Sequence, residues 1–81
     1  MIKLKQVDRP YCAFYRRDNP DGTYRSLPDA HTCLEHAVAA VERRAARPCS
    51  KGETVSLELR GRVIATASMA DVRRNGFVVT P

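Results

Sequence analysis

The chain lacks several features that would place it in a large functional class. No apolar run among its 81 residues approaches the roughly 18 residues that a membrane-spanning helix needs. Residues 1–5 alternate lysine with apolar side chains, whereas a signal peptide contains a continuous apolar stretch. A chain of this length forms one domain. We therefore expect a single domain over residues 1–81 that stays in the cytoplasm and binds no membrane.

Residue patterns that carry chemistry are also scarce. The four glycines are dispersed and form no phosphate-binding loop, and Cys12, Cys33 and Cys49 form no C-x-x-C pair, which indicates free thiols in a reducing compartment. Cys33 and His36 lie three residues apart on a predicted helix. Zinc would need two further ligands at a recognised spacing, and a nucleophile would need a base held by a third group. We therefore predict a non-enzymatic protein with no catalytic, cofactor or metal site.

Acidic residues are outnumbered, with nine aspartates and glutamates against fourteen lysines and arginines, which gives a formal net charge of +5. The imbalance lies in the second half: residues 1–40 hold six basic and five acidic groups, whereas residues 41–81 hold eight and four. Eleven of the fourteen cations are arginine, whose planar fork of donors suits carboxylates, phosphates and aromatic faces. The pattern is typical of a binding surface for such groups or of an ordinary solvated surface.

The first third of the chain reads as strands. Residues 2–5 alternate charged and apolar side chains, and residues 11–17 are rich in aromatics. Residues 19–22, with the sequence Asn-Pro-Asp-Gly, have the residue types of a type I turn at each of its four positions. Residues 23–27 then return as the partner strand. The pattern predicts a first short strand followed by a hairpin.

A single helix is predicted over about residues 32–47. Thr32 and Glu35 fit a capping box at its start, and Pro48 ends it. Arginines cluster near its end, where cations favour the helix dipole. Apolar residues recur at three- and four-residue spacing and form one narrow stripe: Leu34, Ala37, Val38, Val41 and Ala45. Since one stripe buries one face, the helix is expected to lie on a sheet.

The remaining residues predict a second hairpin. Residues 55–59 alternate apolar and polar side chains, Gly61 allows a reversal, and residues 63–67 return. A difference of one residue in loop length decides whether Ile64 or its neighbours Val63, Ala65 and Ala67 face the core, so both registers stay open.

Ser68 caps an expected helical turn that ends at Asn75-Gly76, and residues 77–79 form a closing strand. The predicted fold is therefore α+β, in the order β-β-β-α-β-β plus a helical turn and a last strand. It consists of an antiparallel sheet of about five or six short strands with one helix on one face.

Three short segments resemble the opening of HicB-type antitoxins. Tyr11-Cys12-Ala13 is similar to that family's Y-x-A strand, Asp21 to Tyr24 to its D-G-x-Y turn, and Leu27-Pro28-Asp29 to its F-P-D corner before a helix. The chain lacks the segment that the family places between corner and helix, and also its DNA-binding helical tail. The resemblance implies an antitoxin-like protein.

In size and design the chain resembles the small anti-CRISPR proteins of phages and mobile elements. The likeness lies in residues 11–27, 32–47 and 55–67, which form short strands around one helix without a diagnostic motif. It implies a stoichiometric inhibitor that docks on a CRISPR effector in the host cytoplasm. Many such inhibitors are acidic mimics of DNA. This chain is basic, so the expected target is a protein surface or an acidic patch.

Two sets of residues follow from these hypotheses. For a protein partner, aromatic and arginine anchors on the hairpin and the second turn are the candidates: Tyr11, Tyr15, Tyr24, Arg25, Arg60 and Arg62. A small RNA- or DNA-binding module is the alternative, in which aromatics on an open sheet stack bases and cations meet phosphates: Arg43, Arg44, Arg47, Lys51, Arg73 and Arg74. Pairing of two sheets edge to edge into a homodimer is compatible with either.

Overall fold

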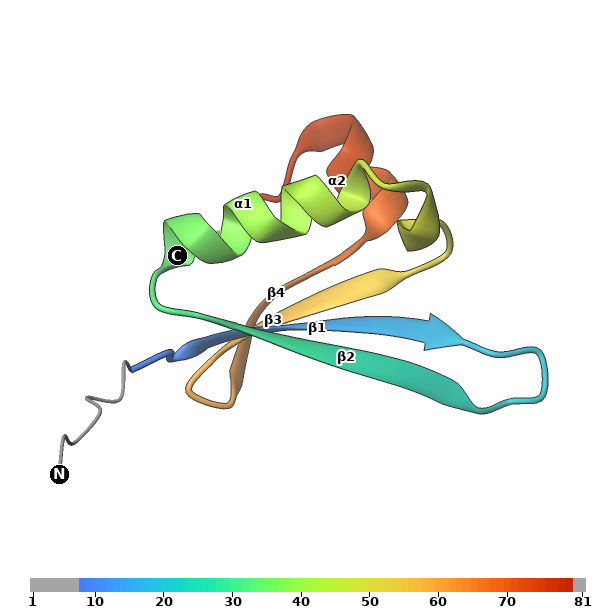
Figure 1. The fold of residues 1–81 in the computed structure, drawn as a ribbon, viewed down its shortest axis with the longest axis horizontal. Helices are drawn as coiled ribbons and strands as arrows, with labels where there is room; N and C mark the ends of the chain where they lie inside the picture. The colour runs from blue at the N-terminus through green and yellow to red at the C-terminus, as the bar shows by residue number, and fades with distance from the viewer. Residues whose placement is uncertain (1–7, 80–81) are drawn as a thin grey trace, which may run out of the picture.

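A computed structural model of the chain describes residues 8–79 as one antiparallel sheet with two helices on the same side of it (Figure 1). The strands lie in the order β2-β1-β3-β4, so β2 and β4 are the edges. The elements follow one another along the chain as β1 (Tyr11–Asp18), β2 (Tyr24–His31), α1 (Leu34–Ala45), a 3-10 turn η1 (Pro48–Ser50), β3 (Thr54–Leu59), β4 (Arg62–Ser68) and α2 (Met69–Asn75).

The predicted α+β class is confirmed, with fewer strands and one more helix than expected. The sheet has four strands where five or six were predicted, and the expected first strand at residues 2–5 lies outside the described residues. Residues 77–79 are not a closing strand. Phe77 is buried in the core, and its backbone N–H donates to Glu42 Oε2 at 3.1 Å. The backbone N–H of Phe77 thus bonds to a side chain of α1, and its ring packs in the core that α1 covers. The segment therefore lies beside the helix and pairs with no strand among residues 8–79.

The turn at residues 19–22 fixes the register of the first hairpin. Gly22 N–H donates to Asn19 O at 3.2 Å, as in the predicted type I turn, and Asn19 N–H donates to Thr23 O at 2.8 Å. Asp21 Oδ1 holds the loop by accepting from Thr23 N–H and from Thr23 Oγ1. Ala13 and Tyr15 consequently face α1, and the residues that alternate with them in β1 face the other side of the sheet.

The second hairpin settles the register that the sequence leaves open. Its two-residue turn has both residues at positive φ, 50° at Arg60 and 85° at Gly61. The pairing between β3 and β4 shifts between Leu57 and Glu58, which places Ile64 as the extra residue of a bulge. Ala65 and Ala67 therefore pack against the core, and so does Ile64. Val63, which the sequence pattern groups with the two alanines, pairs with Glu58 and is 53% exposed.

Small side chains let α1 approach the sheet closely. Its buried residues are Ala37, Val41 and Ala45, which share a core with Tyr15 and Leu57. This confirms the predicted stripe.

The predicted ends of α1 differ from the structure. The helix runs from Leu34 to Ala45 where 32–47 was expected, with Cys33 at its N-cap. The capping box between Thr32 and Glu35 does not form, since no side chain caps this end. The second helix agrees better with the sequence: Ser68 Oγ accepts from Asp71 N–H at 3.2 Å, and Gly76 at φ 77° ends the helix.

Candidate binding surfaces

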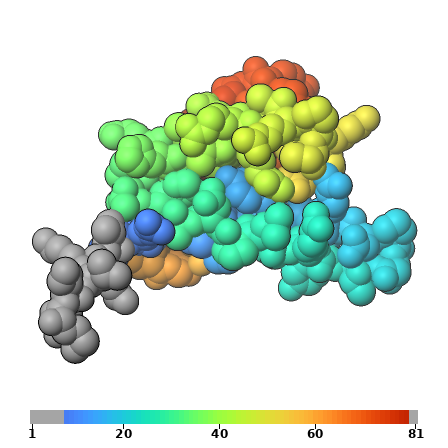
Figure 2. All heavy atoms as spheres, in the orientation of Figure 1, coloured from blue at the N-terminus to red at the C-terminus, as the bar shows by residue number. Residues whose placement is uncertain are grey.

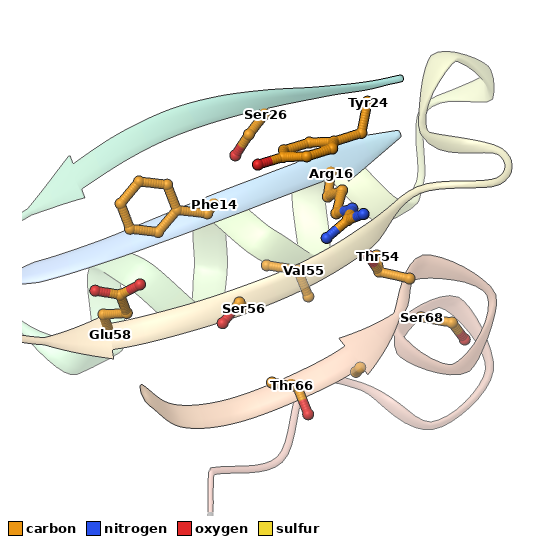
Figure 3. A pocket seen from close by; sticks show the side chains of 11 residues that line it. Phe14, Arg16, Tyr24, Ser26, Thr54, Val55, Ser56, Glu58, Thr66 and Ser68 are labelled. Carbon is orange, nitrogen blue, oxygen red and sulfur yellow. The ribbon is translucent and has the colours of Figure 1, made fainter. Parts of the chain in front are cut away.

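The sheet face opposite α1 carries a shallow hollow of about 540 Å³ (Figure 3). We call this surface the open face. It draws residues from all four strands, because side chains that point away from the helix on neighbouring strands stand side by side. Nine lining residues point away from the helix, and Val55 and Ala67, which pair with each other on the helix side, complete the lining: Phe14, Arg16, Tyr24, Ser26, Thr54, Ser56, Glu58, Thr66 and Ser68.

One corner of the open face is an organised stack of side chains. The guanidinium carbon of Arg16 lies 4.0 Å from the centroid of the Tyr24 ring, a cation–π contact, and Arg16 Nε donates to Asp18 Oδ1 at 3.0 Å. Tyr24 is nevertheless 59% exposed. Phe14 stands on the next part of β1, as Figure 3 shows. An aromatic surface is thus held in place and still open to a partner.

The rest of the open face is polar and close to neutral. Five of its side chains are hydroxyls, which donate and accept hydrogen bonds. The charged side chains on this side of the sheet are Arg16, Asp18 and Glu58, and the first two neutralise each other. Such a face matches another protein surface better than it matches a phosphate backbone, which requires a surplus of cations.

A second hollow, of about 410 Å³, lies between α1 and the edge strand β2. We call it the helix groove. Its lining combines apolar side chains with three arginines: Tyr15, Leu27, Pro28, Asp29, Ala40, Arg43, Arg44 and Arg47. It lies on the helix side of the sheet, so the two hollows are separated by the thickness of the sheet.

An ion pair at the inner wall of the helix groove holds three elements together. Arg44 donates from Nε and Nη2 to the two carboxylate oxygens of Glu53, both at 2.8 Å. Its guanidinium also covers the Tyr15 ring, 4.5 Å from the centroid. The bond to Glu53 raises the pKa of Arg44, and burial raises the pKa of Tyr15 to about 12.

The residues predicted for a protein partner do not form one surface. Tyr24 lies on the open face, whereas Tyr15 is 4% exposed and belongs to the core, so it is not available to a partner. Tyr11 is half-buried on the helix side of β1. Three arginines are exposed elsewhere: Arg25 on β2, and Arg60 and Arg62 at the turn between β3 and β4, where Arg60 pairs with Asp8 at 2.9 Å.

Half of the residues predicted for nucleic acid already have partners within the protein. Arg44 binds Glu53, and Arg74 pairs with Asp71 at 2.8 Å. Arg73 donates to Ala45 O at 2.8 Å, at the last carbonyls of α1. The other three candidates, Arg43, Arg47 and Lys51, are exposed and make no ion pair with a described residue.

The sites predicted from the sequence omit Phe14 and Arg16, although alternation in β1 places both opposite Tyr15. The single predicted helix leaves one face of the sheet uncovered, but the sequence does not determine which set of β1 side chains lies on that face. Cys33 lies at the N-cap of α1, and His36 is exposed on the helix. Across residues 8–79, no three His, Cys, Asp or Glu side chains gather as metal ligands would. Nor does this part of the chain contain a helix of the length and apolarity that crossing a membrane requires.

Comparison with known proteins gives no relative. No family model matches the chain, and no curated protein or solved structure does either. The candidate surfaces therefore depend on the geometry of this chain alone.

Proposed function

We propose that the protein is a non-enzymatic binding protein that docks a partner protein on the open face. The observation that carries this proposal is the uncovered, hollowed sheet surface with an exposed Tyr24 held by Arg16. Tyrosine, phenylalanine and arginine are enriched at protein interfaces, and tyrosine and arginine are frequent among the few residues that carry most of the binding energy. A ring already held in position loses little conformational freedom when a partner covers it.

The polar part of the open face supports a protein partner as well. Serine and threonine side chains from three strands line the shallow hollow. Because these side chains are short, main-chain and side-chain groups of a partner can approach closely and form hydrogen bonds with their hydroxyls. The carboxylate of Glu58 would repel a phosphate backbone at the same surface. Recognition by shape and hydrogen bonds, with one aromatic anchor, is therefore the mechanism that we infer.

The proposal is tested by placing a photo-crosslinking amino acid at single positions. Position 66 lies on the open face, and position 36 lies on the exposed side of α1. In cells that produce the protein, we expect position 66 to capture one protein partner that position 36 does not. S56R, which places a bulky charge in the hollow, should abolish capture from position 66. Capture of nucleic acid, equal capture from both positions, or no capture from position 66 would refute docking on this face.

The most specific form of the proposal is an inhibitor of a CRISPR effector, which the likeness in size and architecture supports. An effector loaded with its guide, incubated with increasing amounts of the protein, should lose target cleavage at about one protein per complex. The S56R variant should leave cleavage intact, and H36A should inhibit like the wild type. Unchanged cleavage with a panel of effectors would exclude this form and leave docking on the open face to be judged by crosslinking.

A further inference from the structure

The helix groove carries a separate set of observations, on the side of the sheet that the proposed function does not use. Its outer wall is β2, an edge strand along most of which the side chains are exposed. In Figure 2, the teal atoms of β2 run across the face of the molecule beneath the green atoms of α1. The groove is therefore open along the strand.

The main chain of β2 has unused hydrogen-bonding groups along this edge. Because Asn19 bonds to Thr23 across the turn, alternation pairs Arg25 and Leu27 with β1 and turns the groups of Ser26 and Ala30 outward. Pro28, on the same side, offers a carbonyl without an N–H. An incoming strand can thus bond to residues 24–30 at all but one position.

The groove is also cationic. Arg43 of α1 and Arg47, which lies between α1 and η1, both line the groove, and neither makes an ion pair with a described residue. Arg44 is neutralised by Glu53. Asp29 is the carboxylate of the lining, and its Oδ2 lies 2.8 Å from His31 Nε2. The guanidinium groups of Arg43 and Arg47 therefore line a groove next to the unpaired edge of β2.

We propose that the helix groove binds an extended acidic segment of a polypeptide. The segment adds to the edge of β2 as a fifth strand and directs carboxylates at alternate positions toward Arg43 and Arg47. Leu27 and Ala40 add apolar surface to the groove, with Leu27 39% exposed. Because every second side chain of a strand points to the same face, a segment that alternates acidic and neutral residues satisfies both walls.

A polypeptide fits this groove better than a single-stranded nucleic acid does. Unpaired bases bind by stacking on aromatic rings, and the aromatic ring in this lining, Tyr15, is buried beneath Arg44. The free main-chain groups of β2 match another main chain. The proposal uses the main chain of β2 and arginines on the helix side of the sheet, whereas the open face uses side chains on the opposite side, so the two proposals are tested separately.

The experiment measures binding of the peptide (Glu-Thr)4-amide, labelled with carboxyfluorescein on its N-terminal amine, to the intact protein. We expect R43A/R47A to weaken binding by about tenfold, since two exposed charge contacts are lost. R60A/R62A removes the same charge from the distant turn between β3 and β4 and should leave binding unchanged. Equal weakening by the two double variants would reduce the effect to net charge and overturn the proposal.

Strand addition is tested with two modified peptides, methylated on the backbone nitrogens of the threonines or of the glutamates. One set of nitrogens faces β2 and the other faces solvent, so one modified peptide should lose binding and the other should keep it. Amide exchange at Ser26 and Ala30 should slow when the unmodified peptide binds. Equal binding of both peptides, or tighter binding of the oligonucleotide (dT)8 that R43A/R47A abolishes, would overturn strand addition by an acidic segment.

Discussion

At the scale of single residues, Arg44 allows two of its neighbours, Tyr15 and Glu53, to be buried. Its guanidinium covers the Tyr15 ring and binds both oxygens of Glu53, whose side chain is 2% exposed. An isolated carboxylate would not be buried to this extent, because desolvation costs several kcal/mol unless a partner compensates. The three side chains thus form one unit that joins α1 to β1 and to the start of β3.

Replacing Arg44 and replacing Glu53 should lower the free energy of unfolding by different amounts. R44M leaves a buried carboxylate without compensation and should lower the free energy of unfolding by about 3 kcal/mol. E53Q leaves a guanidinium that is 23% exposed and can reach water, so its cost should be nearer 1 kcal/mol. The double variant R44M/E53Q should be more stable than R44M. Denaturation in urea measures all three, and a larger loss for E53Q than for R44M would contradict this assignment.

Tyr15 gives the protein a stability that depends on pH. Burial raises its pKa from 10 to about 12, with help from the charge of Asp29, while Arg44 opposes the rise. The folded state therefore holds the phenolic proton more tightly than the unfolded state, so stability is complete below pH 10 and falls as pH rises toward 12. The fall should amount to about 2 kcal/mol across this window.

Denaturation curves recorded from pH 9 to about pH 12 test this linkage. Y15F removes the ionisable group and should flatten this part of the pH profile, whereas Y24F, at the exposed tyrosine, should retain the wild-type fall. A fall of the same size in Y15F would assign the alkaline loss to other groups.

At the scale of elements, the C-terminal end of α1 is held from outside the helix. Arg73 of α2 donates to Ala45 O at 2.8 Å and to Ser50 Oγ at 3.0 Å, and the Ser50 hydroxyl lies 2.8 Å from Arg47 O and 3.2 Å from Ala45 O, to either of which it can donate. These bonds satisfy carbonyls that a helix end leaves without partners. The loop η1 and both helices are thereby locked together.

Arg73 and its neighbour Arg74 form a matched pair for testing this lock. R73A removes charge-assisted bonds to the helix end and should cost about 1.5 kcal/mol of stability. R74A breaks an exposed pair with Asp71 and should cost less than about 0.5 kcal/mol. Thermal or chemical denaturation distinguishes them. Similar losses in the two variants would show that the bonds of Arg73 do not hold the end of α1.

The elements that depend on nearby residues are the ones that the sequence predicts. The turn at residues 19–22 and the cap at Ser68 are set by side chains within three residues. Residues 77–79 have the composition of a strand, and their packing depends on a bond to Glu42, 35 positions away. The burial of Tyr15 likewise depends on Arg44. Tyr24 could be chosen by residue type, but choosing Phe14 and Arg16 required the knowledge of which face of β1 the helix covers.

At the scale of the whole molecule, the sheet has a covered face, an open face and two edges, and each edge of a sheet invites pairing with another chain. Along β2 the chain limits this hazard in two ways. Pro28 removes one outward N–H, and the exposed Arg43 and Arg47 would meet their own copies if two β2 strands paired. The same edge that admits an acidic segment thus resists a second copy of this basic chain.

Restoring the missing donor should change the oligomeric state. P28T supplies an N–H on the free edge of β2 without adding apolar surface, so we expect it to self-associate where the wild type remains a monomer in analytical ultracentrifugation. Higher salt should strengthen association of P28T, because screening reduces the repulsion between Arg43 and Arg47 of the two copies. P20T, which changes a proline in the turn between β1 and β2, is the control and should sediment as the wild type does. Identical sedimentation of P28T and P20T at every salt concentration would show that Pro28 does not protect this edge. The resistance of β2 to pairing would then depend on Arg43 and Arg47 alone.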